Sequence, residues 1–290
     1  MKKIILLCFM FVICYAQGNF ESDFKKGKEY FENENFEKAR DVFEILIEKN
    51  EKSAKVNFYL GYSLFKNNEL DDAIEYLEIA VELEPYNVEY NFKLAQLYGI
   101  DARDASIFRV ISVASSMKEQ LLKTLELDPN HLEARIYLAN FYLQAPGIAG
   151  GDLEQAKIEA EKIIKFDEMR GRILLSQIYL EEDELEKAEN EFKIVEQKFA
   201  DNPDSFSMYN SYGYFLLNQN RIDEAIVKFE KQVQFAPENA NAHDSLGEAY
   251  KINREYEKSI AEYKKALALN PGLKSATNAI EELNLKIIKK

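Results

Sequence analysis

The sequence predicts an all-α protein built as a solenoid of helix-turn-helix units, and three observations support this fold class. A small residue recurs about every 34 residues along nearly the whole chain. Within each period, apolar residues follow the three- and four-residue spacing that places them on one face of a helix. Four periods end near a proline, which cannot donate the hydrogen bond that would continue a helix. Together these features indicate short paired helices that stack along one direction.

The recurring small residues occupy equivalent places in successive units, at Gly27, Gly61, Ala95, Ala139, Ser176, Gly213 and Gly247. A small side chain at this place lets the second helix of the unit approach closely. The unit over residues 57–85 is the most regular. Its first helix places on one face Leu60, Gly61 and Leu64, and its second helix carries the apolar stripe Ala73, Leu77 and Ala80.

This pattern resembles the tetratricopeptide repeat, and the resemblance covers nearly the whole chain after residue 16. It implies a right-handed α-solenoid over residues 17–273, in which each helix pair buries its apolar face against its neighbours. The seven predicted repeats are 20–53, 54–87, 88–131, 132–168, 169–205, 206–239 and 240–273. Residues 274–290 are predicted to form a capping helix, with its apolar face at Ala276, Ala279, Ile280 and Leu283.

The first residues of the chain predict a signal peptide over residues 1–16. Lys2 and Lys3 precede an uncharged apolar run, and small residues stand before a cleavage point ahead of Gln17. The run is shorter than the roughly 20 residues of a spanning helix. We therefore expect export to the periplasm or the medium, with no membrane span after cleavage, and an uncleaved anchor is the alternative. Both cysteines lie within this segment, so cleavage would leave no thiol.

The composition excludes several classes of function. The net charge of −14 disfavours nucleic acid as the main partner, because phosphates repel such a surface. The acidity serves solubility on one interpretation and a basic partner on another. The two histidines, His131 and His243, stand at similar helix starts about three repeats apart, which does not suit a catalytic or metal-binding pair. With no catalytic, metal-binding or cofactor motif, the sequence predicts a protein that is not an enzyme.

Two repeats depart from the regular spacing. The third carries about 10 extra residues within 99–117, which predict either a longer second helix or a protruding turn that touches a partner. The fourth contains a glycine-rich loop over residues 145–152, and its last residue, Asp152, is the expected N-cap of a helix. The Lys and Ser/Thr of a nucleotide-binding loop are missing there, and Asp152 would repel an anion. An ordered turn or a binding tip with Ile148 are the remaining interpretations.

The resemblance also implies that the first helix of each pair lines a concave groove. The predicted partner-binding residues are Phe24, Phe58, Tyr62, Phe65, Phe92, Gln96, Asn140, Gln177, Asn210, Tyr214, Asp244 and Glu248. Aromatic side chains would anchor a polypeptide, amides would pair with its main chain, and the acidic residues would face a basic portion. The alternative is that Phe58, Phe92 and Ile136 pack between helices. The expected groove positions stand three before and one after each recurring small residue, and Lys28 is the only Lys or Arg among them, which disfavours a clamp for a terminal carboxylate.

The sequence therefore predicts an exported scaffold that binds a protein or peptide segment in this groove. Two other hypotheses remain open. The chain could assemble into a homo-oligomer through its irregular third repeat. It could also serve as an accessory subunit of an envelope enzyme, with a ligand near residues 146–151.

Overall fold

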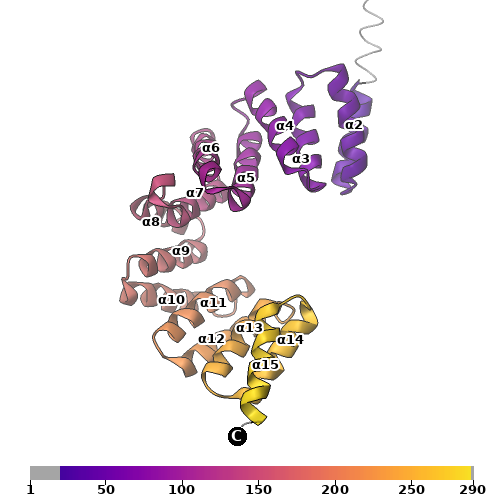
Figure 1. Ribbon diagram of the computed structural model, residues 1–290. Coiled ribbons are helices and arrows are strands. Elements are labelled where there is room, and N and C mark those ends of the chain that lie inside the picture. Colours follow the sequence, from indigo (N-terminus) through magenta and orange to yellow (C-terminus); the bar gives the residue numbers. More distant parts are fainter. Residues whose placement is uncertain (1–19, 289–290) are drawn as a thin grey trace, which may run out of the picture. The chain divides into compact units, whose positions relative to one another are not determined.

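The computed structural model describes residues 20–288, and all regular secondary structure in that range is helical (Figure 1). The predicted signal peptide lies outside the described residues. The first pair joins the helix over residues 20–32 to α2 (Phe36–Lys49). The following pairs are α3 (Ala54–Lys66) with α4 (Leu70–Leu83), α5 (Val88–Asp104) with α6 (Ile107–Leu127), and α7 (Leu132–Gln144) with α8 (Leu153–Ile164).

The remaining pairs are α9 (Glu168–Glu181) with α10 (Leu185–Phe199), α11 (Phe206–Asn218) with α12 (Ile222–Phe235), and α13 (Ala240–Ile252) with α14 (Tyr256–Leu269). Short 3₁₀ helices, η1 (Gly147–Ala149) and η2 (Pro203–Ser205), precede α8 and α11. The last helix, α15 (Lys274–Ile288), packs against α14 with its apolar face, as a capping helix should. The predicted fold class, an all-helical repeat array, is confirmed.

The chain divides into two compact units, residues 1–159 and 160–290, and α8 contains the division. The core of unit 1 includes Phe43, Leu60 and Leu77. The core of unit 2 includes Phe192 and Phe229, and a further cluster joins α14 to α15. Within each unit, successive pairs pack on one another, so the helices contribute their apolar stripes to the core of that unit.

The recurring small residues lie where the two helices of a pair cross most closely. A Cβ atom added to Gly61 would lie 2.4 Å from Leu77 Cδ1, and one added to Gly213 would lie 2.6 Å from the ring of Phe229. Real side-chain contacts are not this short, so these glycines allow the large residue of the second helix to reach the first.

A left-handed residue closes the tight turn within each regular pair. The positive φ angles outside glycine occur at Glu34, Asn68, Asp183, Asn220 and Arg254, each seven positions after the small residue of its repeat. The third and fourth repeats lack this turn. Their equivalent positions are Ala102, which lies inside the lengthened helix α5, and Pro146, whose ring fixes a negative φ. The extra residues of the third repeat therefore lengthen both α5 and α6, and not only the second helix.

A second recurring feature joins successive pairs. The side chain four positions before the small residue contacts a main-chain carbonyl six residues earlier, at the turn that ends the previous pair. The contacts are Asn57 to Glu51, Asn91 to Pro85, Arg135 to Pro129, and His243 to Pro237. Each one satisfies a carbonyl that no helix can pair. His131 serves differently, because its Nδ1 caps α7 by accepting from the Ala134 N–H at 3.1 Å.

Replacing Arg254 with glycine is expected to stabilise unit 2 by about 0.5–1 kcal/mol. Arg254 has φ 62° and an exposed side chain. A side chain costs about 1–2 kcal/mol in the left-handed region, and part of that gain is offset by the greater freedom of glycine in the unfolded chain. Thermal unfolding would measure the gain. Arg254→Ala is the matched control, because it keeps the Cβ atom; an equal gain from alanine would contradict this explanation.

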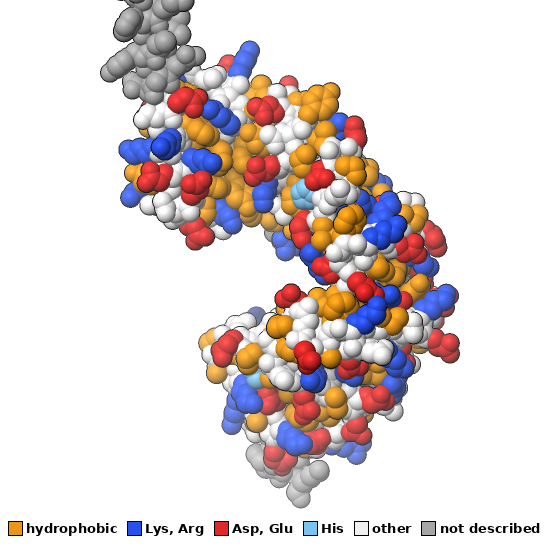
Figure 2. Space-filling model, turned by 180° about the vertical axis from the view of Figure 1, so that it is seen from behind, with side chains coloured by type: hydrophobic (Ala, Val, Ile, Leu, Met, Phe, Trp, Pro, Cys, Tyr) orange, Lys and Arg blue, Asp and Glu red, His pale blue; other side chains and the backbone are white. Residues whose placement is uncertain are grey.

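The surface carries charges of both signs. On the face shown in Figure 2, acidic and basic side chains are interspersed with hydrophobic ones. Within residues 20–288, no helix is both long and apolar enough to cross a membrane. The acidic residues are therefore spread over many positions of the surface.

Candidate functional site

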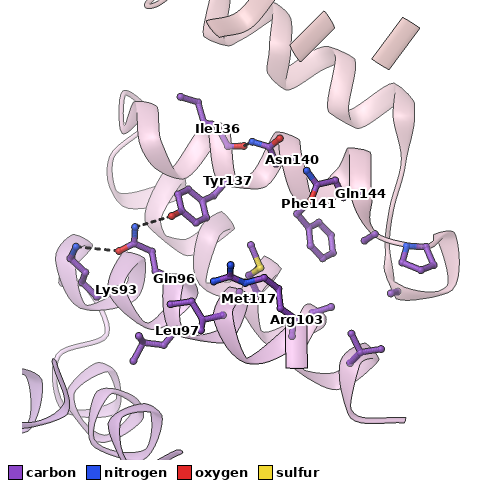
Figure 3. Close-up of a pocket in the computed structure, with 18 of the residues that line it drawn as sticks. Lys93, Gln96, Leu97, Arg103, Met117, Ile136, Tyr137, Asn140, Phe141 and Gln144 are labelled. Carbon is purple, nitrogen blue, oxygen red and sulfur yellow. Dashed lines mark hydrogen bonds between the residues drawn. The ribbon is translucent and has the colours of Figure 1, made fainter. Parts of the chain in front are cut away.

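A pocket of about 720 Å³ lies in unit 1 between the first helices of repeats two to four. Its walls come from α3, α5 and α7, together with the first turns of α6 and the segment around η1 (Figure 3). The residues that line it include Tyr62, Phe65, Lys93, Gln96, Leu97, Ile100, Ala102, Arg103, Val110, Ala114, Met117, Ile136, Tyr137, Asn140, Phe141, Gln144, Pro146 and Ala149.

The two irregular repeats meet at this pocket. Val110, Ala114 and Met117 come from the extra turns of α6, and Pro146 and Ala149 come from the glycine-rich loop. Where a regular repeat would close with a left-handed turn, α5 continues and the fourth repeat makes a wider loop. The space left between the helices becomes the pocket, which the sequence did not predict.

A chain of hydrogen bonds runs along one side of the pocket. Lys93 Nζ donates to Gln96 Oε1 at 3.1 Å, and Gln96 Nε2 donates to the Tyr137 hydroxyl at 3.3 Å (Figure 3). The Lys93 ammonium also lies 5.1 Å from the ring centre of Tyr62, a cation–π distance. Nearby, Asn140 Nδ2 donates to its own helix at Ile136 O, which leaves the amide oxygen of Asn140 available.

The opposite side is apolar with one cation. Figure 3 shows Arg103, Met117 and Phe141 directed toward the middle of the pocket. Among the described residues, the exposed guanidinium of Arg103 has neither a hydrogen-bond nor an ion-pair partner. Two neighbouring carboxylates are engaged elsewhere. Asp101 is buried and pairs with Arg109 at 2.8 Å, and Asp152 caps α8 by accepting from the Gln155 N–H at 3.1 Å.

The glycine-rich loop is held by main-chain hydrogen bonds. The N–H of Gly151 donates to Pro146 O at 3.2 Å, and the N–H of Asp152 donates to Tyr142 O at 2.8 Å. Gly150 adopts a φ of 96°, which favours glycine. Ile148 at the tip is 81% exposed while Ala149 is buried, so the loop is an ordered turn with one apolar side chain facing outward.

The predicted groove residues of unit 1 lie in three different environments. Tyr62, Phe65, Gln96 and Asn140 all line the pocket. Phe24 is half-buried, with the Lys55 ammonium 4.4 Å from its ring centre.

The expectation that Phe58 and Phe92 offer their rings to a partner is wrong. Phe58 is 3% exposed and stacks on Tyr90 of the next pair at 4.5 Å between ring centres. Phe92 is 8% exposed and lies 4.5 Å from the His131 ring. Both rings therefore pack between successive pairs, which is the alternative that the sequence left open.

In unit 2, three predicted residues form one network around a fourth side chain. Ser245 Oγ donates to Asn210 Oδ1 at 3.2 Å and lies 3.1 Å from the Tyr214 hydroxyl, which donates to Glu248 Oε2 at 3.1 Å. Burial raises the pKa of Tyr214 from the ordinary value near 10 to about 12, so the hydroxyl stays protonated and able to donate well above neutral pH. This network presents the carboxylate of Glu248 on α13.

Asp244 lies one turn before Glu248 and accepts from Ser275 Oγ at 3.1 Å. Burial raises the pKa of this carboxyl above its usual range, and the charge of Glu248 adds to the shift. Gln177, on α9 of the same unit, is half-buried and takes no part in the network. Two acidic groups thus lie on one helix face, at the place where the sequence predicts a basic portion of a partner.

The described residues hold no group of three or more His, Cys, Asp or Glu placed to bind a metal ion. His243 is occupied structurally, since its Nδ1 lies 2.6 Å from Glu262 Oε2 and its Nε2 lies 2.9 Å from Pro237 O. His131 caps α7, so both histidines have packing or capping roles.

Sequence profiles of the tetratricopeptide repeat match residues 24–88, 173–239 and 240–273, which together are more than half of the 290 residues. The chain is a tetratricopeptide-repeat protein. The matched profiles describe repeats that serve as scaffolds, and none of them describes a catalytic family. Residues 89–172, which contain nearly all of the two irregular repeats and most of the residues that line the pocket, lie outside the matched segments.

Several known proteins are similar to this tetratricopeptide-repeat protein. The tetratricopeptide repeat protein 36 of Caenorhabditis elegans is 29% identical over 106 residues, which are 36% of this chain and 52% of that protein. The chain thus spans about half the length of the curated relative that it matches. A tetratricopeptide repeat protein of Parabacteroides merdae has a similar structure, with a TM-score of 0.71, 15% identity, and coverage of 91% of this chain and 98% of that one.

Yeast Tom70 has a TM-score of 0.66 at 20% identity, over 87% of this chain and 52% of that one. At such identities these likenesses concern the fold alone. The binding chemistry of the pocket must therefore be argued from this chain's own residues. The sequence did not predict five of the residues that line it: Lys93, Arg103, Met117, Tyr137 and Phe141. Arg103 and Met117 lie in the stretch of extra residues, which was the one available signal.

Proposed function

We propose that this tetratricopeptide-repeat protein is an exported scaffold that holds an extended segment of another protein. The segment lies on the first helices of unit 1 and places one apolar side chain in the pocket. The observation that supports this proposal is the convergence of four predicted groove residues, Tyr62, Phe65, Gln96 and Asn140, on one pocket. Its volume of about 720 Å³ is ample for a large side chain.

The polar groups suit a polypeptide partner. Amide side chains carry both donors and acceptors, so Gln96, Asn140 and Gln144 can pair with the main chain of an extended segment. Tyr62 and Phe65 add apolar contact area, and aromatic residues dominate the binding energy of many interfaces. Burying one large apolar side chain would contribute about 1.5–3 kcal/mol.

Unit 2 offers a second contact of opposite character. Asp244 and Glu248 lie one turn apart on α13, with Glu248 held by Tyr214. Coulombic attraction would favour a basic portion of the partner there. Export rests on the lysines and the apolar run of residues 1–16, and it predicts that the mature chain begins at Gln17.

Affinity capture from the native cell envelope tests the proposal. The bait would be the chain as processed by its own cell, beside the variants Gln96→Ala/Asn140→Ala and Asp244→Asn/Glu248→Gln. We expect a protein that the wild type retains and the first variant loses by tenfold or more, with a smaller loss from the second. Tyr86→Ala is the control, because Tyr86 is 75% exposed in unit 1 and lies outside the pocket.

Circular dichroism would establish that each variant is folded. Equal retention of every protein by the wild type and by the pocket variant would reject the proposed groove. Mass spectrometry of the intact bait would also show its first residue. A chain that begins at Met1 and fractionates with the cytoplasm would reject export.

A further inference from the structure

The pocket of unit 1 has a chemical character that a segment-binding groove does not require. We propose that it is also a binding site for a small amphipathic organic anion, a molecule with one acidic group on an apolar body. This inference goes beyond the scaffold function, because it assigns a small-molecule ligand to a site that the two irregular repeats form together with α3.

The apolar body of the ligand would occupy the inner walls. Leu97 and Ile100 of α5, Val110 and Met117 of α6, and Phe141 of α7 line this part. Pockets of about 300–1,000 Å³ with such linings are typical small-molecule sites, and the volume here is about 720 Å³. Removing an apolar body from water in this space supplies binding energy in proportion to the area buried.

The charge of the pocket is opposite to that of the chain. The protein has a net charge of −14, yet none of the described residues that line the pocket is acidic. Two cations, Lys93 and Arg103, do line it. Arg103 offers a planar set of donors with no partner among the described residues. Lys93 is held in place by Gln96 and the ring of Tyr62.

The net negative charge of the remaining surface does not cancel this local field. Charges more than about 8–10 Å away are largely screened at physiological ionic strength. Asp101 is neutralised by Arg109, and Asp152 is engaged at the start of α8. An anion beside an apolar wall also experiences a lower dielectric than in water, which strengthens its attraction to Arg103.

The loop around η1 closes one side of the pocket, which favours a short ligand over a polypeptide chain that passes through it. Pro146 and Ala149 form a wall of the pocket, and the loop is fixed by hydrogen bonds from Gly151 to Pro146 and from Asp152 to Tyr142. A polypeptide that continued past this wall would have to displace those bonds. A compact molecule with its acidic group near Arg103 would fit without displacing them.

The test uses the mature protein and three probes with the same apolar body: decanoate, the neutral decanol and the cationic decylammonium. Displacement of the fluorescent probe anilinonaphthalene sulfonate would report their affinities. We expect decanoate to bind at least tenfold more tightly than either analogue. Arg103→Gln should reduce its affinity by about tenfold and remove most of that preference, since the guanidinium supplies the charge.

Arg254→Gln is the matched control, because Arg254 is an exposed arginine in unit 2, and it should leave the affinity unchanged. Val110→Trp fills the pocket and should weaken all three probes together. Equal affinities of decanoate and decanol, or full decanoate binding by folded Arg103→Gln or Val110→Trp, would overturn the proposal. Asn140→Ala alone leaves Lys93, Gln96 and Arg103 unchanged, so loss of protein capture with retained decanoate binding in this variant would support the ligand site and the scaffold separately. Capture without any decanoate binding would reject only the ligand site.

Discussion

Replacing Gly151 with alanine is expected to destabilise unit 1 by about 2–3 kcal/mol. An added Cβ atom would lie 1.7 Å from the carbonyl oxygen of Ala145, a main-chain atom that cannot move aside by rotation. The loop must therefore shift, and the hydrogen bonds from Gly151 to Pro146 and from Asp152 to Tyr142 would be strained or lost. Since this loop forms a wall of the pocket, binding of decanoate should weaken in the same variant.

Gly147→Ala provides a control within the same loop. No atom lies within 4 Å of the Cβ position at Gly147, so this substitution should change the stability by less than about 0.5 kcal/mol. Urea unfolding followed by circular dichroism would measure both variants, and amide hydrogen exchange would show whether α7 and α8 lose protection first. Equal stabilities of the two variants would contradict the assigned role of Gly151.

The repeat architecture follows from the sequence because its determinants are local. A small residue is needed wherever two helices of a pair cross, as at Gly61 against Leu77. The apolar residues of each helix must share a face, and a regular turn has a fixed length. These requirements produce the same spacing of small and apolar residues in each regular repeat. Because the spacing recurs, it can be recognised from the sequence alone.

The pocket could be predicted only in part, because it depends on how the helices fold where the third and fourth repeats depart from the regular spacing. The sequence marks extra residues in the third repeat, but it does not reveal that Ala102 continues a helix where the other repeats turn. That continuation brings Arg103 and Met117 opposite Phe141 of the next pair. Lys93 was missed for a related reason, since the helix position that it occupies was not among those expected to face the groove.

The error at Phe58 and Phe92 has a simple geometric cause. Both stand three positions before the small residue, and this register faces the following pair. Phe58 therefore meets Tyr90, and Phe92 meets His131. The equivalent polar residues of unit 2 make hydrogen bonds across the same kind of interface: Asn210 with Ser245 on α13, the first helix of the following pair, and Asp244 with Ser275 on the capping helix α15. The position thus joins neighbouring repeats, with aromatic packing in unit 1 and hydrogen bonds in unit 2.

Gly213→Ala should reverse the usual preference of helices for alanine. In an unconstrained helix this change stabilises by about 1 kcal/mol. Here the new methyl group would lie 2.6 Å from the ring of Phe229, which is fully buried and also contacts Tyr214 at 5.1 Å between ring centres. We expect a net loss of about 2 kcal/mol in the stability of unit 2. Gly247→Ala should cost less, because its nearest neighbour, the ring of Tyr263, lies 3.0 Å away.

A second substitution at the contacted ring would show that the loss arises from this one contact. Phe229→Leu alone should destabilise by about 1–2 kcal/mol, since it removes buried volume. Combined with Gly213→Ala, it frees space for the new methyl group, so the double variant should be at least 1 kcal/mol more stable than the sum of the single changes predicts. Additive effects in urea unfolding would instead mean that the glycine is required for main-chain conformation. A positive coupling would establish that the small residue recurs in the sequence because it permits the close crossing of the paired helices.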